Sequence, residues 1–238
     1  LLLCSMVDAT TASVTPRLIL TSNGLTSSAL RHEFSRFIPE PQKSTVWYIP
    51  TAPLRDGWSE RMTRQQMAQI KKELNLGKIE WIDPEYVTGE TLRQAVQQLG
   101  RVDVVYAEMG NTYNICHHLH KSGGAELVRE LVMSKGAVYV GASAGSIMAG
   151  RTIQMAFWKD WDDRTCEGTI SCDWTNPATA QGLNIAGGRS IFPHANGQYA
   201  QKEWQEMQAR RHGHTDHEVV PLADGEGLVI VGDVARRV

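Results

Sequence analysis

The stretch YVGASAGSIMAG, residues 139–150, decides how this chain folds. It passes from a strand-like start through Gly-Ala-Ser-Ala-Gly into an apolar run that suits a helix. The pattern predicts a sharp strand-to-helix turn at Ser143, where small neighbours remove the clashes that a strained backbone would otherwise cause. Such a serine is either a nucleophile or part of a tight corner. Its place at the end of a predicted strand favours the nucleophile.

Around this stretch, short β-rich runs alternate with helical patterns. The runs are apolar on both faces, as expected of parallel strands covered by helices, and they occupy 17–22, 45–50, 78–83, 102–108 and 137–142. Apolar stripes ending before a glycine predict helices over 61–76, 91–99 and 125–135. The alternation predicts an α/β fold, a doubly wound and mostly parallel sheet flanked by helices. Ligands of such folds bind beyond the carboxyl ends of the strands.

The chain becomes irregular after Ser143. Residues 157–190 are rich in Trp, Asp and Gly. This segment is longer than a loop that only connects two elements, so we expect it to shape a binding site. Closing strands are predicted over 191–194, 218–223 and 227–233, with a helix near 198–211. We expect residues 17–238 to form a single domain and residues 1–16 to be a disordered tail.

Composition excludes several functions. The 238 residues carry a formal net charge of −2 and no Lys/Arg cluster, so a nucleic acid partner is not expected. No apolar run reaches the roughly 18 residues of a membrane span. The four cysteines (Cys4, Cys116, Cys166 and Cys172) fit neither a zinc ribbon nor a disulfide scaffold. We therefore expect no metal, no cofactor, and a cytoplasmic monomer or homodimer with reduced thiols. In the alternative of a secreted protein, Cys166 and Cys172 could form a disulfide.

A serine nucleophile needs a base and an acid. His194 ends a short predicted strand at the edge where Ser143 should emerge, so His194 is the expected base. The acid that orients the imidazole is left open between Glu226, which begins the last predicted strand, and Asp160. The N–H of Ala144, at the start of a helix, would supply half of an oxyanion hole.

These segments together resemble a known family. LILTSNG, VWYIPTA, the segment 107–150 with its Gly-Asn-Thr turn and Ser-Ala-Gly elbow, IFPHANG and LADGEGLVI occur in order. They are similar to the peptidase E (α-aspartyl dipeptidase) and cyanophycinase family of serine peptidases. The resemblance implies the flavodoxin-like α/β sandwich of class I glutamine amidotransferases.

The resemblance also implies roles for individual positions. Ser143 would be the nucleophile and His194 the base, and the acid would be Glu226, with Asp160 as the alternative. Gly110 would donate the second oxyanion N–H beside Ala144, and the following Asn111 and Thr112 would contact substrate. The family has two glycines where this chain has Met109-Gly110. If the first needs a positive φ, Met109 would be strained or would crowd the oxyanion site.

The function implied is that of a serine exopeptidase or dipeptidase. It would hydrolyse small peptides with an N-terminal aspartate through an acyl-enzyme on Ser143. A cation must then pair with the substrate carboxylate, and the candidates are Arg151, Arg164 and Arg189. The alternatives are a cyanophycinase-like hydrolase of β-aspartyl peptides and a catalytically impaired binding scaffold of the same fold.

Overall fold

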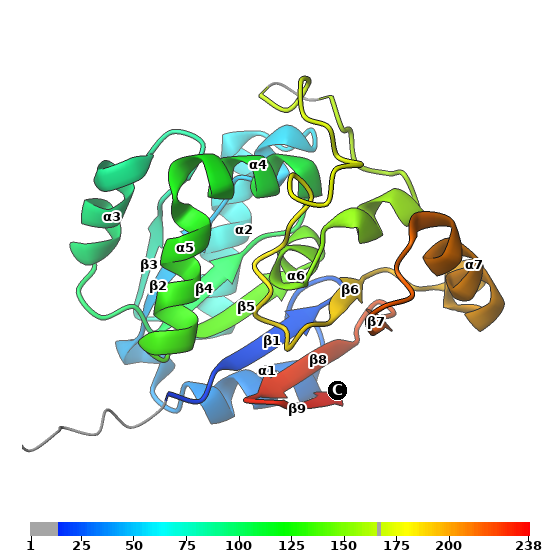
Figure 1. Ribbon diagram of the computed structural model, residues 1–238. Coiled ribbons are helices and arrows are strands. Elements are labelled where there is room, and N and C mark those ends of the chain that lie inside the picture. The colour runs from blue at the N-terminus through cyan, green and yellow to red at the C-terminus, as the bar shows by residue number, and fades with distance from the viewer. Residues whose placement is uncertain (1–13, 166–167) are drawn as a thin grey trace, which may run out of the picture.

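The computed structural model describes residues 14–165 and 168–238, and a seven-stranded sheet forms its centre (Figure 1). The strand order is β3-β2-β4-β5-β1-β8-β9; the first five strands are parallel, whereas β8 and β9 are antiparallel to their neighbours. The strands are β1 (Arg17–Thr21), β2 (Thr45–Ile49), β3 (Lys78–Trp81), β4 (Val104–Ala107), β5 (Val138–Ala142), β8 (Gly227–Val231) and β9 (Val234–Arg237). The predicted fold class and the first five predicted strands are confirmed.

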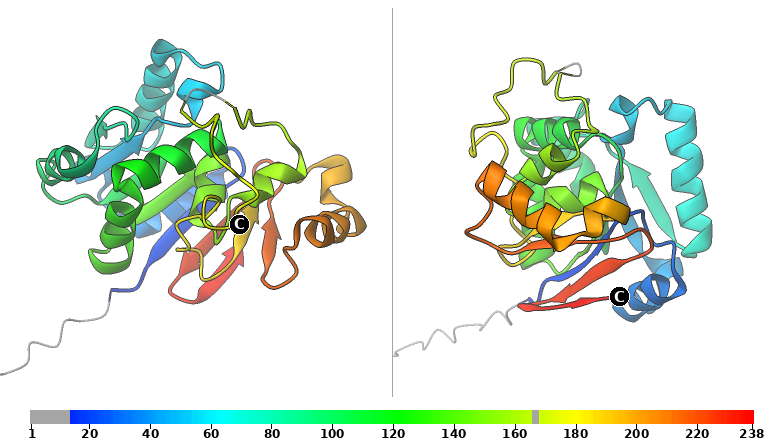
Figure 2. Two further views of the ribbon diagram at one scale, coloured as in Figure 1. Left: turned by 45° about the horizontal axis from the view of Figure 1, so that its top comes forward. Right: turned by 90° about the vertical axis from the view of Figure 1, so that its right-hand side faces the viewer.

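Helices cover both faces of the sheet (Figure 2). On one face lie α1 (Ser28–Phe37) and α2 (Glu60–Glu73). The other face carries α3 (Gly89–Gln97), α4 (Thr112–Ser122), α5 (Gly124–Arg129) and α6 (Ala144–Ala149). The helix expected over 125–135 is α5 followed by one π-helical turn at Glu130–Ser134.

Side chains alternate along each strand and so fill two separate cores. In β2, Trp47 and Ile49 pack under α3 to α6, whereas Val46 and Tyr48 pack under α1 and α2. Strand β4 repeats this alternation. Both faces are buried, which explains why these strands read as continuous apolar runs in the sequence.

The C-terminal part differs from the expectation. Of the three predicted closing strands, only β8 joins the main sheet; β6 (Ser190–Phe192) and β7 (Val219–Pro221) form a separate parallel pair beside α7 (Lys202–His212). Proline has no N–H for a strand ladder, and Pro221 within β7 and Pro193 directly after β6 keep this pair short. Strand β9, the edge strand after β8, was not predicted.

Three expectations fall partly or wholly outside the described residues. Most of the tail 1–16 lies there, as do Cys4 and Cys166, and with Cys166 the alternative disulfide. Cys116 and Cys172 are free thiols. In the described ranges, no helix combines the length and the apolar character that crossing a bilayer requires.

One close approach fixes helix α6 on the sheet. A Cβ atom added to Gly145 would lie 2.1 Å from the carbonyl oxygen of Ala107, at the end of β4. A Cβ atom on Gly141 would lie 2.7 Å from the carbonyl carbon of Gly145. Both glycines of the Gly-Ala-Ser-Ala-Gly stretch are therefore required by backbone packing.

We expect Gly145→Ala to lower the free energy of unfolding by about 3 kcal/mol, because neither backbone segment can move away from the added methyl group. Urea unfolding at neutral pH measures this loss. Gly100→Ala is the control: a Cβ there meets no atom within 4 Å, and its φ of 76° leaves only a conformational cost of about 1 kcal/mol. Equal losses in the two variants would contradict the packing argument.

Candidate active site

Ser143 occupies a strained turn between β5 and α6. Its φ of 45° and ψ of −104° are unfavourable for a residue with a Cβ atom. The backbone around it is tied down: Ser143 N–H donates to the Thr21 carbonyl oxygen over 3.0 Å, and the Ser143 carbonyl accepts from the N–H groups of Ser146 and Ile147. The turn predicted from the sequence is thus present, and its strain is held by hydrogen bonds to β1 and α6.

The buried Ser146 joins this turn to β1. Its Oγ accepts a hydrogen bond from Thr21 N–H over 2.8 Å and lies 2.7 Å from the Thr21 carbonyl oxygen and 2.8 Å from that of Gly141. Its one proton serves one of these two carbonyls at a time. An alanine at this position would leave all three backbone groups without this partner.

His194 lies beside the Ser143 side chain. It follows β6, and its Nε2 lies 2.9 Å from Ser143 Oγ. Its backbone is also left-handed, with φ of 54°, and its N–H donates to Ser22 Oγ over 2.8 Å. The predicted pairing of Ser143 with His194 is the geometry that a general base needs to accept the hydroxyl proton.

The carboxylate on the far side of the imidazole belongs to Asp224. Its Oδ1 lies 2.6 Å from His194 Nδ1 and accepts from Ser22 Oγ over 2.8 Å, while Oδ2 accepts from Asn196 Nδ2 over 2.7 Å. Burial opposes ionisation of Asp224, but the hydrogen bonds from Ser22, His194 and Asn196 outweigh it and lower the pKa. The Nδ1 proton of His194 therefore faces an anion, which leaves Nε2 free to accept from Ser143.

Neither expected acid contacts His194. Glu226 Oε2 accepts from Ala223 N–H over 2.9 Å and pairs with Arg237, and Asp160 pairs with Arg164. The predicted segment does contact His194, but through Asp224 and not through Glu226, because a turn from Ala223 to Glu226 carries Asp224 toward the histidine. Ser22 and Asn196 were missed as site residues, although each lies inside a segment that carries the family resemblance, LILTSNG or IFPHANG.

Two backbone N–H groups in the turns that follow β4 and β5 were expected to form an oxyanion hole. Within residues 14–165 and 168–238, neither Gly110 N–H nor Ala144 N–H has a hydrogen-bond partner. Gly110 has φ of 130°, and a Cβ atom there would lie 2.5 Å from the Ala52 carbonyl carbon, so glycine is required. The strain expected at Met109 is absent, since its φ is not positive; its N–H instead bonds to Glu108 Oε1 over 3.0 Å.

A small cavity of about 40 Å³ lies beside Ser143 and His194. Lys159 lines it, with Nζ donating to the carbonyl oxygens of Pro193 and His194. The rings of Trp161, Tyr199 and Phe192 surround the ammonium group at 4.2, 4.5 and 4.9 Å. Burial lowers the pKa of Lys159 to about 8, although the charge of Asp224 opposes this.

Only one of the residues predicted to contact substrate lines this cavity. Thr112 lines the cavity. Asn111 is buried and occupied, accepting from Asn114 N–H and donating to the Asp163 carbonyl. The three candidate arginines are paired elsewhere: Arg151 with Asp216, Arg164 with Asp160, and Arg189 with Glu218. Lys159 is the one Lys or Arg among the described residues that line the cavity, and it was not predicted.

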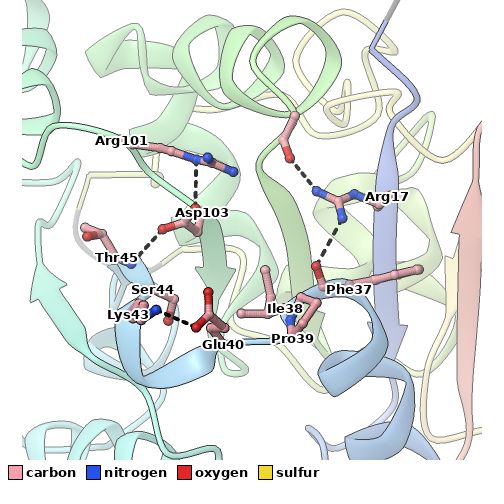
Figure 3. A pocket seen from close by; sticks show the side chains of 11 residues that line it. Arg17, Phe37, Ile38, Pro39, Glu40, Lys43, Ser44, Thr45, Arg101 and Asp103 are labelled. Atoms are coloured by element: carbon pink, nitrogen blue, oxygen red, sulfur yellow. Dashed lines mark hydrogen bonds and ion pairs between the residues drawn. The ribbon is translucent and has the colours of Figure 1, made fainter.

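A larger cavity of about 560 Å³ lies at the opposite, amino end of the strands (Figure 3). Its charged groups are occupied: Arg17 donates to the carbonyls of Phe37 and Gly136, and Asp103 pairs with Arg101 and accepts from Thr45 N–H. It holds no serine–histidine pair. The described residues contain no group of three or more His, Cys, Asp or Glu that could hold a metal ion.

A second Ser–His–Asp arrangement occurs away from Ser143. Ser190 Oγ lies 2.9 Å from His217 Nε2, and His217 Nδ1 lies 2.7 Å from Asp216 Oδ1. Ser190 is fully buried within β6 and has no positive φ. A cavity of about 490 Å³ beside His217 does not include it.

Comparison with known proteins identifies a family for this sequence. The sequence profile of peptidase family S51 matches residues 18–238. The uncharacterized peptidase Lmo0363 of Listeria monocytogenes is 26% identical over 199 residues, covering 84% of this chain and 88% of that protein. The resemblance inferred from the sequence is thereby confirmed.

Solved structures share the fold. A Listeria monocytogenes protein described as a candidate peptidase E superimposes with a TM-score of 0.71 at 22% identity, covering 94% of this chain and 98% of that one. A peptidase from an acI-B1 Actinobacterium gives a TM-score of 0.66 at 15% identity, with 95% and 88% coverage.

We expect Asp224→Asn to lower kcat/KM by about 10³–10⁴-fold, because the neutral amide no longer fixes the imidazole tautomer or stabilises its protonated form. Steady-state hydrolysis of a peptide substrate measures the loss. Glu226→Gln and Asp160→Asn are the matched controls, since each removes one carboxylate charge and contacts no part of His194; both should stay within a few fold of the parent. A large loss in Glu226→Gln with a small one in Asp224→Asn would reverse the assignment.

Proposed function

We propose, from the premise that this chain belongs to peptidase family S51, that it is a serine exopeptidase acting through Ser143. The observation that carries the proposal is the continuous chain of short contacts from Ser143 Oγ to His194 Nε2, 2.9 Å, and from His194 Nδ1 to Asp224, 2.6 Å. In this assignment Ser143 is the nucleophile, His194 the general base, and Asp224 the residue that orients the base.

The reaction proceeds in two halves. Ser143 Oγ attacks the scissile carbonyl carbon while His194 Nε2 takes the hydroxyl proton. The oxyanion of the tetrahedral intermediate binds the free N–H groups of Gly110 and Ala144. Collapse breaks the C–N bond, and His194 returns the proton to the leaving amine. Water then attacks the acyl-enzyme, with its proton passing to His194, and the acid product leaves as Ser143 regains its proton.

The preferred substrate is a short peptide with an N-terminal aspartate. The cavity beside the nucleophile is small, which suits one compact residue on the acyl side of the scissile bond. Lys159 Nζ uses two of its three N–H donors on carbonyl oxygens, so one donor and the positive charge are available to a substrate carboxylate. Lys159 thus takes the role that the sequence had offered to three arginines.

We expect release of p-nitroaniline from Asp-p-nitroanilide to exceed that from Leu-p-nitroanilide by at least tenfold, because an ion pair with Lys159 favours the acidic side chain. Ser143→Ala should lower turnover by several orders of magnitude. Absorbance at the p-nitroaniline band follows both. Unchanged turnover in Ser143→Ala would refute the mechanism, and absence of turnover on peptides of any kind would favour the impaired scaffold.

We expect the preference for Asp-p-nitroanilide over the isosteric Asn-p-nitroanilide to fall as pH rises through about 8, because Lys159 is charged below its lowered pKa and neutral above it. The ratio of the two kcat/KM values is the measurement, since a general effect of pH on catalysis cancels in it. Lys159→Met should lower the ratio below pH 8 and abolish its pH dependence. If Lys159 only supports His194, both substrates will lose activity equally and the ratio will not change.

A further inference from the structure

The cavity beside Ser143 carries an anion as well as a cation. Asp162 lines it, and Asp162 Oδ2 accepts from Thr112 N–H over 2.7 Å at the start of α4. Among the ion pairs of the described residues, none involves Asp162 and none joins it to Lys159. The two charged side chains therefore form no direct ion pair with one another.

Thr112 supplies a second polar group without a partner. Its side chain is 1% exposed, it lines the same cavity, and its Oγ1 has no hydrogen bond to any described residue. A buried hydroxyl that is left unpaired costs free energy, so such a group at a cavity wall indicates a polar ligand.

The surroundings of Asp162 favour a cation. Burial raises the pKa of Asp162, while the hydrogen bond from Thr112 N–H and the charge of His194 oppose this rise. The pKa of Asp56 is raised as well, chiefly by burial and then by the negative charge of Asp162. A positively charged group placed here would relieve the repulsion between the two carboxylates.

We infer that Asp162, with the Thr112 hydroxyl, binds the free α-ammonium group of the substrate. The inference rests on the proposed function, because it treats the cavity beside Ser143 as the substrate site. An N-terminal aspartyl residue carries an α-ammonium group and a side-chain carboxylate close together. Asp162 offers the charge opposite to the ammonium group, and Lys159 offers the charge opposite to the carboxylate. The ligand class is a peptide with an unblocked N-terminus, and a peptide without that ammonium group is rejected.

Binding to the Ser143→Ala variant tests the inference without turnover. Titration calorimetry at neutral pH compares the dipeptide Asp-Leu with succinyl-Leu, which keeps the side-chain carboxylate and lacks only the α-amino group. A charge-assisted contact predicts that Asp-Leu binds about tenfold to a hundredfold more tightly. Asp162→Asn in the same background should remove this preference, since the amide keeps an oxygen for the Thr112 N–H and loses only the charge.

The control is Asp163→Asn, which removes the same charge from the neighbouring exposed residue, whose carboxylate bonds only to Thr165; it should keep the preference. If the preference survives in Asp162→Asn, or if Ser143→Ala binds both ligands equally or neither at millimolar concentration, the inference is wrong. Failure of the proposed function is a separate result: it appears as absent turnover in the parent enzyme, whereas the binding comparison is made in a variant that cannot turn over.

Discussion

The carboxyl end of β1 is the constraint on which the rest of this site depends. Thr21 closes the strand and binds the elbow twice, through its carbonyl to Ser143 N–H and through its N–H to Ser146 Oγ. The next residue, Ser22, binds the other half of the site, accepting from His194 N–H and donating to Asp224. Two adjacent residues thus hold Ser143 and His194 in place relative to one another.

This arrangement explains why strained backbone is tolerated at two places. Ser143 and His194 both have positive φ, and each such residue costs on the order of 1–2 kcal/mol. The hydrogen bonds to Thr21 and Ser22 offset this cost, and the glycine at position 145 lets the start of α6 pack closely against Ala107. Strain, packing and hydrogen bonding therefore act on the same few atoms, and they place Ser143 Oγ within reach of His194.

The sequence predicted those parts of the site that local patterns encode. The elbow at Ser143 and the histidine after a short strand are such patterns, and so are the parallel strands with apolar residues on both faces. The acid is different, because Asp224 and Glu226 both lie in ADGEG and only a four-residue turn decides which carboxylate faces His194. Lys159 was missed for a related reason: it lies in an irregular loop, and its ammonium group is surrounded by Trp161 of the same loop and by Phe192 and Tyr199 from distant parts of the sequence.

A pattern of hydrogen bonds alone does not identify a nucleophile, as the second Ser–His–Asp arrangement shows. Ser190, His217 and Asp216 repeat the contacts of Ser143, His194 and Asp224 at similar distances. Ser190 nevertheless lies in an ordinary strand, fully buried and outside the neighbouring cavity, so no carbonyl can approach its hydroxyl. Ser143 differs in three respects: its strained turn faces a cavity, two N–H groups without a described partner lie in the turns after β4 and β5, and Lys159 and Asp162 line the cavity. The backbone around a serine, more than its hydrogen-bond partners, therefore separates a reactive hydroxyl from a structural one.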